Sequence, residues 1–371
     1  MKILHLLYES KGDYFGIGGV GIRAYEIYTR LKDRHDITLV CKKYPGARNA
    51  DIDGLRHIFV GAESKSLTKT LLSYAFHSAL FVKKHQREFD VIIEEFSPAV
   101  PTSLHMFCRR PCILQIQGYT GILYFRKYNP VYALFLYLSE RFRPRFYNNL
   151  IFVTQETERK LFLNKKKHIA VIPNGISQDL LKTPVSQGTY LLYYGRIDIY
   201  GKGLDILLKA YREFVRSFPD IRLVVAGDGR DRKIFEEKIK TLPDQVRKHI
   251  EMVGWISDDK KPEVISNGIC AIFPSRHEVQ GICVLEAMAC GKPVIVSDIH
   301  ELAYVPENGS GISFRTGDSS SLAEAMKKIL RSNDRQAMGQ KGRDWVRNFT
   351  WDTIALQYEK YLQDVISKNE Q

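Results

Sequence analysis

The sequence predicts an α/β protein built from two doubly wound domains. An apolar strand, a loop that contains glycines and a helix follow one another over residues 2–33, and the same layout returns over residues 190–218. Strands that alternate with helices form parallel sheets, and their ligands bind where the carboxyl ends of the strands meet the loops. A length of 371 residues is enough for two domains with separate cores.

The composition is that of a soluble globular protein, with 44% hydrophobic and 26% charged residues. The six cysteines show neither a CxxC pair nor a metal-type spacing with histidine, so we interpret them as buried thiols of a reducing compartment. The apolar run at residues 3–8 is too short for a signal peptide or a spanning helix, and no later run approaches the length needed to cross a bilayer. We therefore expect a cytoplasmic protein.

A net charge of +13 calls for a partner or an explanation. Nucleic acid is not expected, because the sequence shows no zinc pattern, no RNP-like strand and no recognition helix. An anionic membrane surface or a polyphosphate ligand fits the charge equally well. Lysines and arginines that only solvate helix faces explain most of the excess.

The most informative stretch is residues 275–298, which predicts a polar loop, a helix that ends at Gly291 and a buried strand. Glu278 falls in the loop and Glu286 on the helix, which places their carboxylates on the order of 10 Å apart. The carboxylates of a retaining glycosidase lie only about 5 Å apart, so this pair suits the two ends of an extended ligand better.

The start of that helix predicts an anion site between the two glutamates, formed by the free N–H groups of Gly281, Ile282 and Cys283. Carboxylates for sugar hydroxyls on either side of amides for phosphate indicate a nucleotide sugar. In the alternative interpretation, Glu278 is a helix-start charge favoured by the dipole and Glu286 is a solvated helix residue.

The whole run FPSRHEVQGICVLEAMACGKPVIVSD, residues 273–298, strongly resembles the donor-binding signature of the retaining glycosyltransferases of family 4. The resemblance implies the GT-B fold, in which two Rossmann-like domains face a central cleft. It also implies that Glu278 contacts sugar hydroxyls and that Glu286 contacts the ribose. The similarity is tight over residues 193–298 and looser before residue 175.

The loop that opens the second half carries Arg196 and Lys202, which match the Gly-Arg and Lys-Gly pairs of the family. Because the loop follows a strand, we expect both side chains in the cleft, where they would stabilise a leaving diphosphate. The resemblance further implies that Gly227 and Ile256 line the nucleotide pocket. Backbone groups would read the base there, so a UDP-sugar and a GDP-sugar remain equal alternatives.

In the first half, Gly18 and Gly19 resemble the glycine pair that closes over the donor phosphates in this family. Gln117 stands where many members have a histidine that contacts the donor sugar, and glutamine cannot act as a base at neutral pH. Glu94 and Glu95 are candidate acceptor-side groups, although strand-end acids that face solvent are the simpler interpretation.

Three segments follow from these patterns. We expect an acceptor-binding domain over residues 1–182, a nucleotide-sugar-binding domain over 183–352, and over 353–371 a helix that crosses back to the first domain. The linker is expected within residues 180–189, which lack apolar periodicity.

Residues 119–149 are unusual, because ten aromatic and five basic residues stand against a single glutamate. One interpretation is an ordinary buried helix over 131–140 with a basic loop on each side. The other is an acceptor-binding or membrane-facing surface, since aromatic and basic residues together suit the headgroup zone of a bilayer. Arg126, Lys127, Arg141, Arg143 and Arg145 are the cations of that interpretation.

Together these patterns predict a metal-independent retaining glycosyltransferase that needs no cofactor beyond its UDP-sugar or GDP-sugar donor. Its acceptor would be a hydroxyl compound, most plausibly a lipid-linked or cell-envelope glycan precursor reached from the inner face of the membrane. Asp51 and Asp53 resemble a metal clamp, but their place before Gly54 indicates a turn. A nucleotide-sugar epimerase of similar fold and a non-catalytic nucleotide-sugar-binding protein are the alternatives.

Overall fold

The computed structural model describes residues 1–12, 16–161 and 166–369. The chain forms two compact units, of which the first comprises Met1–Asn174 and the chain from Trp351 onward, and the second Gly175–Thr350. The first junction therefore lies after Asn174, whereas the sequence placed it after residue 182. The reason is that Ile176 and Leu180 are buried in the core of the second unit.

The sheet of the first unit has eight strands in the order β3-β4-β2-β1-β5-β6-β7-β8, and all its pairs are parallel except β3 with β4. The apolar segments predicted as strands form its centre. The strands are β1 (Lys2–Leu6), β2 (Asp36–Lys42), β3 (Ala50–Ile52), β4 (Leu55–Val60), β5 (Val91–Glu95), β6 (Cys112–Ile116), β7 (Asn149–Phe152) and β8 (His168–Val171).

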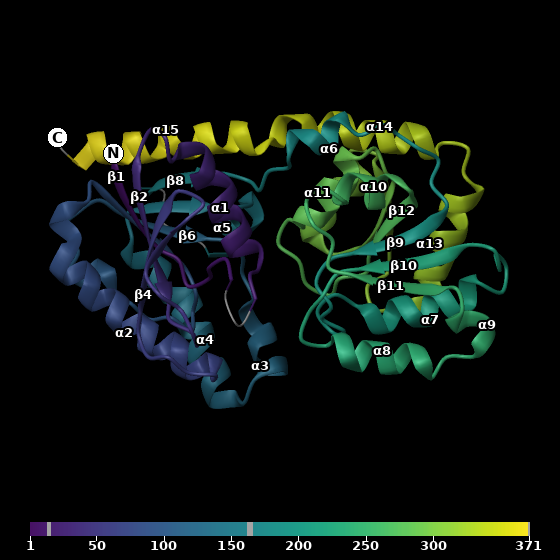
Figure 1. The fold of residues 1–371 in the computed structure, drawn as a ribbon, viewed down its shortest axis with the longest axis horizontal. Coiled ribbons are helices and arrows are strands. Elements are labelled where there is room, and N and C mark those ends of the chain that lie inside the picture. Colours follow the sequence, from purple (N-terminus) through teal and green to yellow (C-terminus); the bar gives the residue numbers. More distant parts are fainter. Residues whose placement is uncertain (13–15, 162–165, 370–371) are drawn as a thin grey trace. The chain divides into compact units, whose positions relative to one another are not determined.

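Helices cover both faces of this sheet because successive strand residues point to opposite sides. Leu4 and Leu6 of β1 pack with residues of α2 (Leu67–His85) on one face. On the other face, Nδ1 of His5 is hydrogen-bonded to the hydroxyl of Tyr28 of α1 (Gly19–Leu31), at a distance of 2.9 Å. Helix α15 lies against α1 (Figure 1). The hydroxyls of Tyr28 on α1 and Tyr358 on α15 are 3.3 Å apart. The helices are α1 (Gly19–Leu31), α2 (Leu67–His85), α3 (Tyr124–Lys127), α4 (Pro130–Phe142), α5 (Gln155–Leu161) and α15 (Trp351–Asn369).

Helix α4 begins as its sequence indicates, with Pro130 in the first turn and Asn129 as the cap that accepts a hydrogen bond from the amide of Tyr132.

The second unit has a six-stranded, fully parallel sheet in the order β11-β10-β9-β12-β13-β14. Leu191 and Tyr193 of β9 belong to one apolar core, and Leu192 and Tyr194 belong to the other. Figure 1 shows α7 and α8 on one side of this sheet and α10 and α11 on the opposite side. The strands are β9 (Tyr190–Tyr194), β10 (Arg222–Ala226), β11 (Ile250–Gly254), β12 (Gly268–Phe273), β13 (Val294–Ser297) and β14 (Gly311–Phe314).

Both sheets have the doubly wound arrangement that the sequence predicted. Helix α7 buries the face that the apolar spacing indicated, with Leu204, Leu207, Leu208 and Tyr211 among its buried residues. The helices of the second unit are α6 (Gln178–Lys182), α7 (Leu204–Phe214), α8 (Arg232–Lys240), α9 (Asp244–Arg247), α10 (Lys261–Ser266), α11 (Ile282–Ala289), α12 (Tyr304–Glu307), α13 (Ser319–Arg331) and α14 (Arg335–Val346). Among the described residues, every helix is too short or too polar to cross a membrane.

Candidate functional site

The candidate site of the second unit lies where the loop after β9 meets the loop after β12. The amide of Arg276 donates to the carbonyl of Gly201 at 3.0 Å, and the Arg276 guanidinium pairs with both oxygens of Asp205 at 2.7 and 2.8 Å. A Cβ on Gly203 would lie 1.9 Å from the carbonyl oxygen of Pro274. The two loops are therefore fixed to each other, backbone against backbone.

Lys202 and Glu278 meet at this junction. Nζ of Lys202 lies 2.5 Å from Oε2 of Glu278, and the Glu278 side chain is only 15% exposed. Ser275 Oγ and the amide of Val279 donate longer bonds of 3.4 Å to the same carboxylate. Burial raises the pKa of Glu278, but the charge and hydrogen bond of Lys202 outweigh it and hold the pKa below its usual range.

Glu286 is not a solvated helix residue. It is 8% exposed, its Oε2 accepts from the hydroxyl of Tyr194 at 2.6 Å, and its Oε1 accepts from Nζ of Lys261 at 3.1 Å. Lys261 also pairs with Asp258 at 2.8 Å. Burial lowers the pKa of Lys261, but the carboxylates of Glu286 and Asp258 outweigh burial and raise the pKa above its ordinary value, so the lysine stays charged.

In the chain, the start of α11 lies between Glu278 and Glu286, the carboxylates of these two ion pairs. Gly281 precedes the helix with a φ of 74°, a conformation that favours glycine. Because glycine has no side chain, it does not cap the amides at the start of the helix. The Cys283 thiol lies in the electrostatic field of Glu278, Glu286, Lys202 and Lys261, and burial raises its pKa to about 12. The structure therefore brings Gly281, Ile282 and Cys283 together with both glutamates, as the sequence predicted for this stretch.

The remaining predicted residues of the second unit surround the same strand ends. Arg196 is the second residue after β9 and is exposed, and among the described residues it forms no ion pair. Gly227 follows β10, where a Cβ would lie 1.8 Å from the carbonyl oxygen of Gly195. Ile256 is 7% exposed in the loop after β11. Gly227 thus has a packing reason to be glycine in addition to the role implied by the family.

The predicted residues of the first unit are placed differently from expectation in one respect. Gly18 caps α1 and Gly19 begins it, but the amides of Gly18 and Gly21 donate to Oε2 of Glu9 at 2.9 and 2.8 Å. A carboxylate of the chain itself therefore occupies the amide of Gly18, one of the two glycines expected to face phosphate. Residues 13–15 of this loop lie outside the described residues.

Gln117 follows β6, and its side-chain nitrogen is buried without a hydrogen-bond partner among the described residues. A buried amide of this kind needs an acceptor, which a sugar hydroxyl can provide. Gln117, Gly18 and Gly19 belong to the first unit, and the residues around the start of α11 belong to the second.

The interpretation of Glu94 and Glu95 as acids that face solvent is wrong, since both are buried. Glu94 accepts hydrogen bonds from Thr102, Arg143 and Tyr147, and Glu95 accepts one from Gln115 at 2.7 Å. Both oxygens of Glu94 thus accept hydrogen bonds from the first unit itself, which indicates a structural role. These contacts also remove Arg143 from the group of surface cations predicted over residues 119–149.

The acidic pair Asp51 and Asp53 lies in a hairpin. Asp53 and Gly54 have φ angles of 54° and 77° and connect Ile52 to its partner Leu55 on β4, as in a two-residue turn. Asp53 pairs with Lys11 and, through its carbonyl, with Lys32 at 2.8 Å. The part of the chain that the structure describes holds no cluster of three His, Cys, Asp or Glu side chains with metal-binding geometry.

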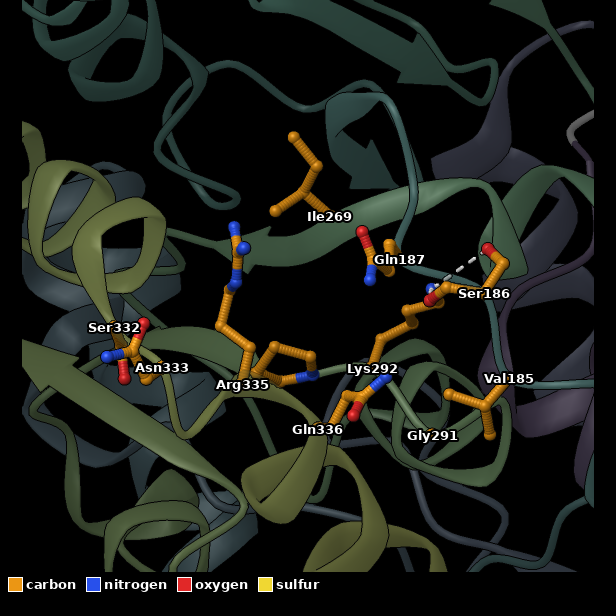
Figure 2. Close-up of a pocket in the computed structure, with 11 residues that line it drawn as sticks. Val185, Ser186, Gln187, Ile269, Gly291, Lys292, Ser332, Asn333, Arg335 and Gln336 are labelled. Atoms are coloured by element: carbon orange, nitrogen blue, oxygen red, sulfur yellow. Dashed lines mark hydrogen bonds between the residues drawn. The ribbon is translucent and has the colours of Figure 1, made fainter.

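A small cavity elsewhere in the second unit shares none of the predicted residues (Figure 2). Lys292 is 1% exposed beside it and donates from Nζ to the carbonyl of Ser186 at 2.7 Å. This contact fixes the segment before β9 to the end of α11, which indicates a structural role for Lys292.

Sequence reasoning missed Lys261, Tyr194 and Glu9. Lys261 stands in a charged run that reads as an ordinary loop, and Tyr194 reads as a buried strand residue. For Glu9 the sequence does offer a signal, because it is an acid nine residues before Gly18, the glycine at the start of a predicted helix, and acids bind favourably at helix starts.

Comparison with known proteins agrees with this geometry. The model of the family described as glycosyl transferases group 1 matches residues 182–345, and that described as glycosyltransferase family 4 matches residues 17–180. A phosphatidyl-myo-inositol mannosyltransferase of Mycobacterium leprae is 30% identical over 203 residues, which are 52% of this chain and 53% of that protein. A glycogen synthase of Mycobacterium tuberculosis is 30% identical over 200 residues, or 50% of this chain and 46% of that protein. The matched region thus spans about half of each of these relatives.

Solved structures share the fold over nearly the full length. Sucrose-phosphate synthase from Thermosynechococcus elongatus has a TM-score of 0.81 at 19% identity, and the match covers 99% of both chains. WaaG, a glycosyltransferase involved in lipopolysaccharide biosynthesis, has a TM-score of 0.71 at 17% identity and covers 98% of this chain and 99% of its own. Anabaena Alr3699/HepE in complex with UDP-glucose has a TM-score of 0.76 at 19% identity, with 98% and 100% covered. The chain therefore belongs to the glycosyltransferases of family 4 and has their GT-B fold.

Proposed function

We propose that the protein is a retaining, metal-independent glycosyltransferase that moves a sugar from a nucleoside-diphosphate sugar to a hydroxyl acceptor. The observation that carries the proposal is the Lys202–Glu278 ion pair beside the start of α11. It joins a cation and amides suited to a diphosphate with a carboxylate suited to a sugar that gains positive charge.

Each group has a distinct task in the proposed reaction. As the bond between the anomeric carbon and the diphosphate oxygen breaks, negative charge grows on the leaving oxygen, where Arg196, Lys202 and the α11 amides stabilise it. Glu278 stabilises the oxocarbenium-like sugar. The acceptor hydroxyl then bonds to the anomeric carbon and gives up its proton, in one scheme to the leaving phosphate on the same face.

The positive charge of these groups also supports independence from divalent metal, since Lys202 and the helix start can perform the charge neutralisation that a metal provides elsewhere. Glu286 holds the ribose in this proposal, with Lys261 and Tyr194 fixing its carboxylate. The choice between UDP and GDP stays open. That Alr3699/HepE was solved with UDP-glucose favours testing UDP-sugars first.

For the acceptor we propose a lipid-linked or cell-envelope glycan precursor, and a cytoplasmic enzyme that meets it at the inner membrane face. Support comes from the names of similar proteins, a phosphatidyl-myo-inositol mannosyltransferase and a transferase of lipopolysaccharide biosynthesis. An epimerase would need an acid or base at the sugar ring, and the Gln117 amide offers neither.

The test is incubation of the purified protein with radiolabelled UDP-sugars and GDP-sugars, with and without a lipid extract and with and without EDTA. Transfer or slow donor hydrolysis, unchanged by EDTA and giving an α-linked product from an α-linked donor, is the expected result. Interconversion of the donor without loss of the nucleotide would identify an epimerase. Binding of the donor without any turnover would identify a binding protein, and activity restored only by manganese would refute metal independence.

A further inference from the structure

Helices α3 and α4 and the turns beside them form a surface rich in exposed apolar side chains. The most exposed are Val131 at 82% and Ile122 at 73%. We call this region the α3–α4 surface, and its large exposed apolar residues are Ile122, Leu123, Phe125, Tyr128, Val131, Leu134, Phe135, Leu138, Phe142 and Phe146. Such a concentration on one surface marks an interaction site.

The apolar residues of α4 follow helical spacing on the side that faces solvent. Leu134, Leu138 and Phe142 recur every four residues and are 42–48% exposed. The opposite face is the one that packs on the protein, with Ala133, Leu136 and Glu140 buried. The interpretation of residues 131–140 as an ordinary buried helix is therefore wrong, because one complete face of α4 is unpartnered.

The exposed charges of the α3–α4 surface are all positive. Arg126, Lys127 and Arg145 are exposed. The single acid of residues 119–149, Glu140, is 2% exposed and accepts hydrogen bonds from the amides of Thr120 and Gly121 at 2.9 and 2.6 Å. An apolar strip with a purely basic border complements an anionic lipid surface and repels a second copy of itself.

Two arginines of the same segment serve the protein instead. Arg143 is buried against Glu94, and Arg141 donates to the carbonyls of Lys160 and Leu161 at 3.3 and 3.0 Å. With three exposed cations instead of five, electrostatic attraction to an anionic bilayer is weaker than the sequence suggested. The remaining affinity must come from the exposed apolar residues of α4, Leu134, Leu138 and Phe142.

We propose that the α3–α4 surface docks on an anionic lipid bilayer, with α4 lying in the plane of the interface. The exposed leucines and phenylalanines would enter the boundary between headgroups and acyl chains, and Arg126, Lys127 and Arg145 would pair with headgroup phosphates. The docking itself is independent of the reaction. That the same membrane carries the acceptor rests on the proposed function.

Flotation with vesicles of phosphatidylcholine, with and without phosphatidylglycerol, tests the docking of the full-length protein. Binding should require the anionic lipid. Changing Arg126, Lys127 and Arg145 to Ser should lower partitioning on the order of a hundredfold at low salt, because each cation near an anionic surface contributes roughly fivefold. Changing Leu134 and Leu138 to Ser should lower it at least tenfold at both low and high salt.

Matched controls keep the test specific. Lys209, Arg212 and Arg216 are exposed basic residues of the second unit, and Ile234 and Leu356 are 56% and 55% exposed. Serine at these positions should leave binding unchanged. Calorimetry with bare UDP or GDP should give the same affinity for every variant that folds as the wild type does.

Three results would overturn the proposal. Equal binding to neutral and anionic vesicles would do so. Leu72 and Phe76 of α2 are 55% and 62% exposed, so full binding by the Leu134 and Leu138 variant, with loss on changing Leu72 and Phe76, would place the docking on α2 instead. Light scattering that shows a dimer broken by the Leu134 and Leu138 changes would assign the surface to a second copy. Docking without transfer would refute the proposed function alone, and transfer without docking would refute this inference alone.

Discussion

Lys202 and Glu278 form an ion pair with each other, with Nζ of the lysine 2.5 Å from Oε2 of the glutamate. The cation expected to hold the diphosphate and the carboxylate expected to hold the sugar are thus fixed at one point, although 76 residues separate them in the chain. In the proposed reaction the phosphate beside Lys202 becomes more negative and the sugar beside Glu278 becomes more positive, so each side chain has the charge opposite to the one that develops on its partner. The pair is therefore arranged to act on the transition state more than on the bound donor.

We expect Glu278→Ala to lower kcat on the order of a hundredfold or more while changing the affinity for the bare nucleoside diphosphate far less. In the proposed function this carboxylate contacts the sugar, which the bare diphosphate lacks. Single-turnover kinetics and calorimetry measure the two effects separately. Ser275→Ala, which removes only a 3.4 Å contact to the same carboxylate, is the control and should stay within a fewfold of wild type. Near-normal turnover of Glu278→Ala would show that the assignment is wrong.

Glu286→Ala should instead weaken binding of the bare diphosphate, by roughly tenfold or more, because the ribose loses its acceptor and Lys261 loses its buried partner. Tyr194→Phe removes one donor to Glu286 and leaves Lys261 in place, so its effect should be smaller and of the same kind. Calorimetry with UDP and GDP checks both. If Glu286→Ala lowers kcat and leaves nucleotide affinity unchanged, the two glutamates have been assigned in the wrong order.

The sequence predicted both sheets and the loop, helix and strand around Glu278, because local patterns determine strand ends and helix starts. The family resemblance assigned Lys202 and Glu278 to one donor site, but the ion pair between them was not predicted. The sequence did not predict what pairs with Glu286. Tyr194 lies 92 residues away and Lys261 lies 25 residues away, so both contacts depend on how β9 and α10 pack against α11. For the same reason Arg143 was interpreted as a surface cation. Its buried partner Glu94 lies 49 residues earlier in the chain, and no neighbouring residue in the sequence indicates that contact.

Glu9→Gln should raise the affinity for the bare diphosphate by roughly tenfold, if the amides of Gly18 and Gly19 bind phosphate. The Glu9 carboxylate holds the amides of Gly18 and Gly21 at 2.9 and 2.8 Å, and it would both compete with a phosphate and repel it. Glu26→Gln, farther along α1, is the control and should have no effect. A loss of affinity in Glu9→Gln would instead show that Glu9 shapes the loop for its ligand.

Arg143→Ser should cost on the order of 3–5 kcal/mol in the free energy of unfolding, because it leaves Glu94 buried without its charge partner. Arg145, two residues later, is exposed and lies over the Phe142 ring at 5.3 Å, so Arg145→Ser should cost less than about 1 kcal/mol. Urea denaturation of the two variants provides the comparison. Equal costs would mean that the buried pair contributes nothing beyond an exposed contact.

The lowered pKa of buried Lys292 should make the stability of the protein depend on pH. Burial lowers the pKa of Lys292 from its ordinary 10.5 to about 8, while the pKa values of the neighbouring Cys270 and Cys290 thiols are raised to about 12 by burial. Arg335 lines the same cavity and keeps its charge throughout this range (Figure 2). Above about pH 9 the two thiols also change charge on folding, because the unfolded chain ionises them and the folded protein does not. The contribution of Lys292 is therefore measured as the difference between the wild type and Lys292→Met, in which the contribution of the thiols cancels.

Below pH 8 the lysine is charged in both states, and burial of that charge costs stability. As the pH rises from 8 towards 10.5, Lys292 loses its proton in the folded protein and keeps it in the unfolded chain, so the contribution of Lys292 to stability rises. The free energy of unfolding of the wild type, minus that of Lys292→Met, should increase by up to about 3 kcal/mol across this window. Urea denaturation of both proteins at pH 7.5, 8.5 and 9.5 measures the difference. A difference that stays constant, or that falls with pH, would show that Lys292 is already neutral or is held charged by the Ser186 contact.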